Sequence, residues 1–178
     1  MLHKAIEFAT IAHKNQVRKG TGVPYIVHPF EVCQILTAAG AEEWVICAGI
    51  LHDTVEDTAI TLEDIKNEFT DQIAALVSAN SENKTLSWEK RKQHTIDYLK
   101  NRASFEEMLV ACADKLSNLR SLQFDRKKMG ESIWSRFNRG YEKQKWYYKE
   151  LLDALKPLND YAMYQELAAA YQDIFQAV

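Results

Sequence analysis

Apolar residues recur at helical spacing along nearly the whole chain, and no stretch alternates with the two-residue period of a half-buried strand. Only three prolines and six glycines interrupt this pattern in 178 residues, so few positions disfavour a helix. The pattern predicts an all-α fold. Helices are expected over residues 2–17, 29–39, 41–53, 61–69, 71–79, 87–100, 104–122, 133–155 and 160–176.

Glycine-containing and polar segments separate the expected helices. Residues 18–24 hold two glycines and a proline, and residues 123–132 are polar and expected to be loose. Thr61 followed three positions later by Asp64 resembles a capping box, which predicts a helix start. No repeat or linker divides the chain, and 47% of its residues are hydrophobic. We therefore expect one core and one domain over residues 1–178.

The charge balance and the N-terminus narrow the range of partners. A net charge of −3 and a pI near 6.0 disfavour a nucleic-acid or anionic-membrane binder, which usually shows a basic excess. The N-terminus shows no apolar signal-peptide region, and we expect no membrane span. Cys33, Cys47 and Cys112 form no Cys-x-x-Cys pair. We interpret them as buried filler in a reducing compartment, the cytoplasm.

Residues 51–57 hold four ionisable side chains directly after a buried run. Residues 45–51 are apolar or small, and His52 and Asp53 follow at the end of that helix. Buried charge needs a partner, and a metal ion is the best one. If the helical backbone continues, Glu56 and Asp57 lie three and four positions after Asp53 and share its side. The spacing predicts three carboxylates and an imidazole facing one pocket.

Two further polar residues stand where the pattern predicts a core. His28 lies at a helix entrance before Pro29, and Asp114 lies on an otherwise apolar helix. A lone His-Asp dipeptide is more often a core histidine or a helix cap, so only the combination indicates a metal site. Two imidazoles and two carboxylates suit manganese, iron or zinc better than calcium, which prefers oxygen ligands.

Four segments together resemble the HD-domain phosphohydrolases, and within them the small alarmone hydrolases of the RelA/SpoT-homologue family. The segments are Ala-His-Lys-Asn-Gln-Val-Arg-Lys-Gly at 12–20, Pro-Tyr-Ile-Val-His-Pro at 24–29, Leu-His-Asp-Thr-Val-Glu-Asp-Thr at 51–58 and Ala-Asp-Lys-Leu-Ser-Asn-Leu-Arg at 113–120. Their order and spacing fit the family from residue 1 to about residue 155.

The resemblance implies a compact helical fold and an activity. The family binds one divalent metal, commonly Mn²⁺, and removes pyrophosphate from the 3′ position of guanosine tetra- and pentaphosphate, leaving GDP or GTP. The matching metal ligands are His28, His52, Asp53 and Asp114. Glu56 and Asp57 match the pair that orients and deprotonates the attacking water.

The resemblance also implies contacts with a small nucleotide substrate. Arg18 and Lys19 match a basic pair in the nucleotide pocket, where the arginine stacks on the base; both also suit a helix C-terminus. Asn118 matches a residue near the base and ribose, or else supports the metal site. Tyr141 corresponds to an aromatic residue that contacts the nucleotide, although aromatic residues at helical spacing are usually core.

The chain departs from the family pattern around the distal phosphates. Residues 81–84 read Ser-Glu-Asn-Lys where the family often has Thr-Asp-Asp-Lys. Lys84, Lys90, Arg136 and Arg139 are the candidate replacements for missing basic contacts. The alternatives are hydrolysis of an adenine alarmone, an HD-type nucleotide phosphatase such as an NADPH phosphatase, and a non-catalytic nucleotide sensor. Monomer and homodimer both stay open.

Overall fold

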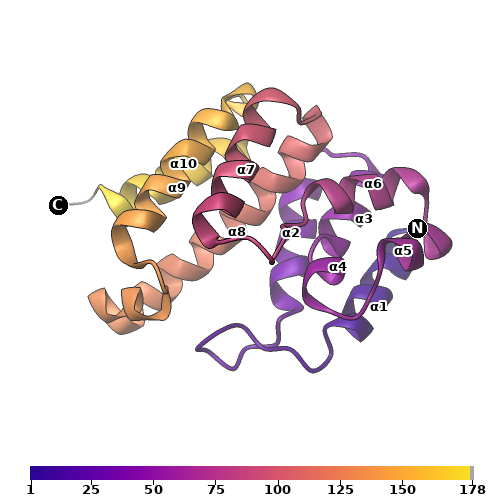
Figure 1. Cartoon of the computed structure of the whole chain (residues 1–178), viewed down its shortest axis with the longest axis horizontal. Coiled ribbons are helices and arrows are strands. Elements are labelled where there is room, and N and C mark those ends of the chain that lie inside the picture. Colours follow the sequence, from indigo (N-terminus) through magenta and orange to yellow (C-terminus); the bar gives the residue numbers. More distant parts are fainter. Residues whose placement is uncertain (177–178) are drawn as a thin grey trace.

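The computed structural model describes residues 1–176 and confirms the all-α fold (Figure 1). Residues 177 and 178 of the expected domain lie outside this described part. The elements are α1 (Leu2–Ala12), α2 (Val27–Ala38), α3 (Glu43–Leu51), α4 (Thr54–Asp57), α5 (Leu62–Glu68), α6 (Asp71–Ala79), α7 (Trp88–Asn101), α8 (Phe105–Met129), η1 (Gly130–Arg136), α9 (Gly140–Ala154), η2 (Lys156–Leu158) and α10 (Ala162–Phe175). Across residues 1–176, no helix is both long and apolar enough to cross a bilayer.

The first helix is shorter than predicted. It ends at Ala12, and the chain then turns so that Val17 forms an isolated bridge with Pro24. The Arg18 N–H donates to the Val23 carbonyl at 2.7 Å. These contacts give the backbone of the predicted helix end other partners, and they turn the glycine-containing segment back toward α2.

The prediction for residues 123–155 was wrong in two places. The segment 123–132 was expected to be loose, but α8 continues through it to Met129. Its polar residues form a surface face, where the Arg126 guanidinium pairs with Glu131 and donates to the Ile174 carbonyl. Gly130, with φ of 59°, ends α8, so residues 130–136 form a 3₁₀ segment and α9 begins only at Gly140.

Helix α8 joins two groups of helices. In Figure 1 the helices α1–α6 gather on one side of the molecule, and α7, α9 and α10 gather on the other. α8 contacts α2 and α3 from the first group and α10 from the second. α3 is buried along most of its length, from Val45 to Leu51. A helix that is apolar all round is typical of a protein centre.

Gly49 allows α2 and α3 to approach closely. A Cβ atom at this position would collide with the Leu36 side chain and lie 3.3 Å from Val32 Cγ1. Both neighbours are fully buried. The glycine therefore sets the separation of two helices that carry predicted metal ligands at their ends.

We expect Gly49→Ala to lower the free energy of unfolding by about 1–3 kcal/mol, because the added methyl overpacks the α2–α3 contact. Urea unfolding measures this change. Ala38→Ser, at an exposed position of α2, is the control and should change stability by less than about 0.5 kcal/mol. Equal stabilities of the Gly49 variant and wild type would contradict the packing argument.

Candidate metal centre and nucleotide cavity

The four predicted metal ligands meet in the interior. His28 lies in the first turn of α2, His52 and Asp53 directly follow α3, and Asp114 comes from the middle of α8. Ligand atoms of His28, His52 and Asp114 all lie within 4.8 Å of one another. Asp53 Oδ2 lies 3.0 Å from His52 Nε2 and 3.5 Å from His28 Nε2. The structure thus brings together residues that are 86 positions apart.

Hydrogen bonds at Nδ1 fix the orientation of both imidazoles. The Gly49 carbonyl can only accept, so the bond of 2.7 Å to His52 requires a proton on Nδ1. The Ser117 hydroxyl donates to Glu31 at 2.7 Å and therefore accepts from His28 Nδ1 at 2.8 Å. In the neutral rings, both Nε2 lone pairs then face the carboxylates.

This arrangement requires a cation and fits a divalent metal. His52 Nε2 is buried and has no hydrogen-bond partner within residues 1–176. Two lone pairs and two carboxylates around one point repel one another unless positive charge lies between them. Imidazoles that are held through Nδ1 and carboxylates with outer hydrogen bonds are typical of metal sites. The donor set therefore suits a divalent metal ion.

The pKa shifts of His52, Asp53 and Asp114 also indicate that positive charge is favoured at this point. Burial alone lowers the pKa of His52, but the carboxylates of Asp53 and Asp114 outweigh it and raise the pKa well above the usual range. Burial also opposes ionisation of both carboxyls, yet the imidazoles, and Lys115 beside Asp114, hold their pKa values low. These directions agree with a position between the four side chains that favours positive charge.

Glu56 and Asp57 lie beside the metal ligands, as their spacing predicted. The helical turn continues after α3, because the Asp57 N–H donates to the Asp53 carbonyl at 2.9 Å. Both side chains line a cavity of about 490 Å³ together with His28, Asp53 and Asp114; we call it the metal cavity. Burial raises the pKa of Glu56. A carboxylate with a raised pKa is a better proton acceptor.

Backbone and lysine contacts hold the Glu56–Asp57 pair in place. Glu56 Oε2 accepts from the Glu82 backbone N–H at 2.9 Å. Lys84 Nζ donates to the Glu56 carbonyl at 2.8 Å and pairs with Asp57 Oδ1 at 2.5 Å. Lys84, a candidate phosphate contact in the sequence, thus contacts the carboxylate pair.

Three polar residues of the segment 12–29 support the site although the sequence alone did not identify them as site residues. The Tyr25 hydroxyl donates to Asp53 Oδ2 at 2.6 Å, and the His13 ring lies against the Tyr25 ring at 5.0 Å. Gln16 accepts from His13 Nδ1 at 2.6 Å and donates to the Asp57 carbonyl. Their only signal in the sequence was the match of this segment to the family.

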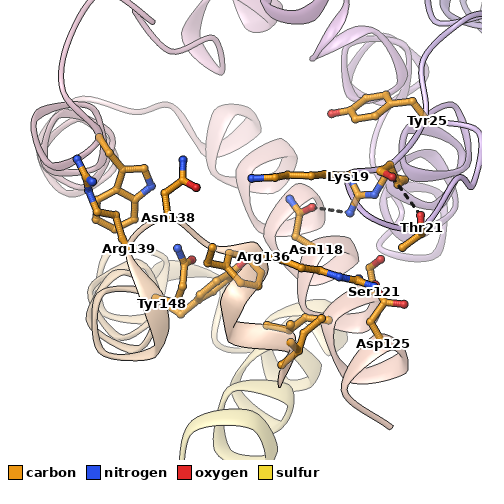
Figure 2. Close-up of a pocket in the computed structure, with 16 residues that line it drawn as sticks. Lys19, Thr21, Tyr25, Asn118, Ser121, Asp125, Arg136, Asn138, Arg139 and Tyr148 are labelled. Atoms are coloured by element: carbon orange, nitrogen blue, oxygen red, sulfur yellow. Dashed lines mark hydrogen bonds and ion pairs between the residues drawn. The ribbon is translucent and has the colours of Figure 1, made fainter. Parts of the chain in front are cut away.

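Figure 2 shows a second cavity, of about 410 Å³. It adjoins the metal cavity, because Tyr25 and Asn118 line both. We call it the nucleotide cavity. The Arg18 guanidinium lies over the Tyr25 ring at 5.6 Å and donates to Asn118 Oδ1 at 2.9 Å. Figure 2 shows the Lys19 side chain extending across this cavity toward Asn138. The aromatic residues of its lining are Tyr25, Trp88, Phe137 and Tyr148.

The predicted substrate contacts are only partly brought together. Arg18, Lys19 and Asn118 line the nucleotide cavity, and Asn118 also donates to Asp114 Oδ1 at 2.6 Å. Tyr141 lines neither cavity, because its hydroxyl donates to the Phe175 carbonyl at 2.8 Å. Its role in nucleotide binding stays a prediction. Of the other candidate cations, Arg136 and Arg139 line the nucleotide cavity, whereas Lys90 lines neither.

A family model described as HD domain matches residues 5–139. The chain belongs to the HD-domain family. The match covers the metal ligands, the carboxylate pair and most of the nucleotide cavity.

The relatives of this HD-domain protein include small enzymes of similar length. The guanosine-3′,5′-bis(diphosphate) 3′-pyrophosphohydrolase MESH1 of Homo sapiens is 42% identical over 124 residues, which cover 68% of this chain and 69% of the relative. The Danio rerio enzyme of the same name is 38% identical over 125 residues, with 68% and 69% covered. These matches confirm the predicted membership of the RelA/SpoT-type branch.

Two solved structures agree with this assignment. A protein of Listeria monocytogenes EGD-e superposes with a TM-score of 0.79 at 42% identity, covering 84% of this chain and 99% of that one. A metazoan orthologue of SpoT, described as hydrolysing ppGpp, gives a TM-score of 0.77 at 27% identity, covering 98% and 93%.

Divalent metal should stabilise the fold, because the folded state binds it and the unfolded chain lacks the preformed site. At metal concentrations 100-fold above Kd, we expect thermal unfolding to shift upward by about 5 °C or more. His52→Gln should lose most of this shift, whereas the exposed His3→Gln control should keep it. A full shift in the His52 variant would exclude this residue as a ligand.

Tyr25→Phe should weaken metal binding about 10-fold, because it removes the hydroxyl that orients Asp53. Calorimetric titration with Mn²⁺ measures the affinity. Tyr161→Phe is the matched control, since Tyr161 lines neither of the two cavities. Unchanged affinity in the Tyr25 variant would show that its hydroxyl does not support the metal site.

Proposed function

We propose that this chain is a Mn²⁺-dependent 3′-pyrophosphohydrolase of nucleotide alarmones, which converts guanosine tetra- or pentaphosphate to GDP or GTP and pyrophosphate. One observation carries the proposal. The Glu56–Asp57 pair lines the same cavity as His28, Asp53 and Asp114, and a second cavity, lined by Arg18, Lys19 and aromatic residues, shares Tyr25 and Asn118 with it. The activity named for the relatives supports it.

His28, His52, Asp53 and Asp114 would hold the metal. Two imidazoles and two carboxylates form a mixed nitrogen and oxygen set, which suits Mn²⁺ better than Ca²⁺. When bound, the metal takes charge from a phosphate oxygen and lowers the pKa of a nearby water. Three cysteines without disulfide bonds suit the reducing cytoplasm as the place of action.

Glu56 and Asp57 direct the water in this proposal. Glu56 accepts a backbone hydrogen bond with one oxygen, Oε2. Its other oxygen, Oε1, lies 3.7 Å from Lys84 Nζ and is the atom that would take a proton from water. Asp57 is held by Lys84 and orients the same water. The water oxygen bonds to the phosphorus next to the ribose, the bond from phosphorus to the 3′ oxygen breaks, and that oxygen takes up a proton. Pyrophosphate leaves with the new oxygen.

The nucleoside lies in the nucleotide cavity in this proposal. The planar Arg18 guanidinium, held in place by Asn118 and the Tyr25 ring, offers a flat cation against which a base can stack. Lys19 has no ion-pair partner within residues 1–176 and extends across the cavity (Figure 2). An anionic phosphate on the 5′ side is the group it suits.

Product identity separates this proposal from its rivals. Pyrophosphate released from a 3′-diphosphate supports it, whereas orthophosphate released from a monophosphate ester indicates an HD-type phosphatase. Tight nucleotide binding without turnover indicates a sensor. Guanine and adenine alarmones assayed side by side, with chromatography of the products, decide the base.

Glu56→Gln should reduce kcat at least about 100-fold, because the amide keeps the size of the side chain but cannot accept the proton from water. Steady-state assay of pyrophosphate release with Mn²⁺ measures the loss. The metal affinity should change little, since Glu56 is not among the proposed ligands. Glu63→Gln, at an exposed position of α5, is the control. Turnover equal to wild type in the Glu56 variant would refute the assigned role.

A further inference from the structure

One wall of the metal cavity carries more positive charge than the acidic residues on it neutralise. Arg91 and Lys92 on α7 and Lys115 on α8 line this wall, and their side chains are 22%, 17% and 17% exposed. Lys115 pairs with Asp114, which also belongs to the metal site. Arg91 and Lys92 share the carboxylate of Glu82. Three cations thus face two carboxylates, and a largely buried charge is costly without an opposite charge.

The Glu82 carboxylate is bound by its neighbours much as a phosphate group is bound. Its Oε1 accepts from Lys92 Nζ at 2.7 Å and from the Thr95 hydroxyl at 3.3 Å. Its Oε2 accepts from Arg91 NH1 at 2.9 Å. Charged donors that converge on one point are the usual way in which proteins hold phosphate oxygens.

Arg91 and Lys92 have binding capacity that Glu82 does not use. The Arg91 Nε–H is buried and lacks a partner in the described part of the chain. Burial, and repulsion from Lys115, lower the pKa of Lys92. Another anion at this wall would satisfy the guanidinium donor and stabilise the lysine charge.

The wall lies where a chain of two phosphates would extend from the nucleoside. The Glu82 backbone N–H donates to Glu56, so the cluster adjoins the water-directing carboxylate. Along α8, residues after Asn118 line the nucleotide cavity, whereas Asp114 and Lys115 before it line the metal cavity. With the nucleoside in the first cavity and the 3′ phosphorus at Glu56, the second phosphate continues deeper into the metal cavity.

We propose that Arg91 and Lys92 form the binding site for the distal phosphate of a 3′-diphosphate, and that the Glu82 carboxylate occupies this site until the substrate enters. This inference rests on the proposed function. A diphosphate gains charge-assisted hydrogen bonds from both cations. A monophosphate ester reaches the metal but not these donors. The pair would therefore make the enzyme select diphosphate over monophosphate groups.

Calorimetric titration of the Mn²⁺-loaded protein with inorganic pyrophosphate and with orthophosphate tests this selection. Wild type should bind pyrophosphate more tightly. Arg91→Met and Lys92→Met should each weaken pyrophosphate binding about 10-fold, the usual loss for one charged hydrogen bond, and change orthophosphate binding less than about threefold. Lys90→Met, on the same helix but outside both cavities, is the control. Equal losses for both anions, or no loss, would overturn the proposal.

Glu82→Gln tests the same proposal through a change that should increase the affinity for pyrophosphate. Removing the competing charge should tighten pyrophosphate binding about threefold or more, whereas a variant with a damaged fold would bind it more weakly. Unchanged or weaker binding by a variant with wild-type secondary structure would refute the role of Glu82. The probes are inorganic anions, so failure of alarmone turnover would count against the proposed function without affecting this result.

Discussion

The site of this molecule depends on the attraction between a positive charge and the two imidazoles and two carboxylates that surround it. His28 and His52 direct their Nε2 atoms at Asp53 and Asp114, and their Nδ1 atoms are already engaged. Helices α2, α3 and α8 carry these groups, and α2 and α3 approach closely at Gly49, where a Cβ atom would collide with Leu36. The helices whose packing forms this part of the core are therefore the same helices that position the proposed metal ligands.

The proposed reaction is divided between two adjoining cavities. The metal cavity holds the groups that we propose to act on phosphorus and water, and the nucleotide cavity holds those that suit a nucleoside. Asn118 links them, because it accepts from Arg18 and donates to Asp114. A base stacked on Arg18 would thus be positioned by the same hydrogen-bonded chain that orients a metal ligand. Tyr25 also lines both cavities, and its hydroxyl donates to Asp53.

The sequence predicted the helical architecture because it depends on patterns within a few residues, whereas the proposed metal ligands came from the resemblance of four separate segments to a family. The capping box at Thr61 and the helix Asp71–Ala79 agree with prediction, and so does the turn that places Glu56 beside Asp53. A polar stretch such as 123–132 is ambiguous, since the surface face of a long helix and a loop have similar composition.

Tertiary contacts explain what the sequence did not reveal. Gln16 and Tyr25 act on the site through hydrogen bonds to residues 41 and 28 positions away, and no local pattern marks such partners. Likewise, Arg91 and Lys92 belong to a charged run that is usually a solvated helix face. Only the fold shows that this part of α7 faces the metal cavity. Tyr141 illustrates the reverse, because packing against Phe175 takes it away from both cavities.

In the proposed reaction, water that is directed by Glu56 and Asp57 attacks the phosphorus next to the ribose. Hydrolysis of the guanine alarmone in ¹⁸O-labelled water, followed by mass spectrometry of the products, tests it most directly. The label should appear in pyrophosphate, with an unlabelled nucleotide. Label in the nucleotide, or in released orthophosphate, would contradict the mechanism.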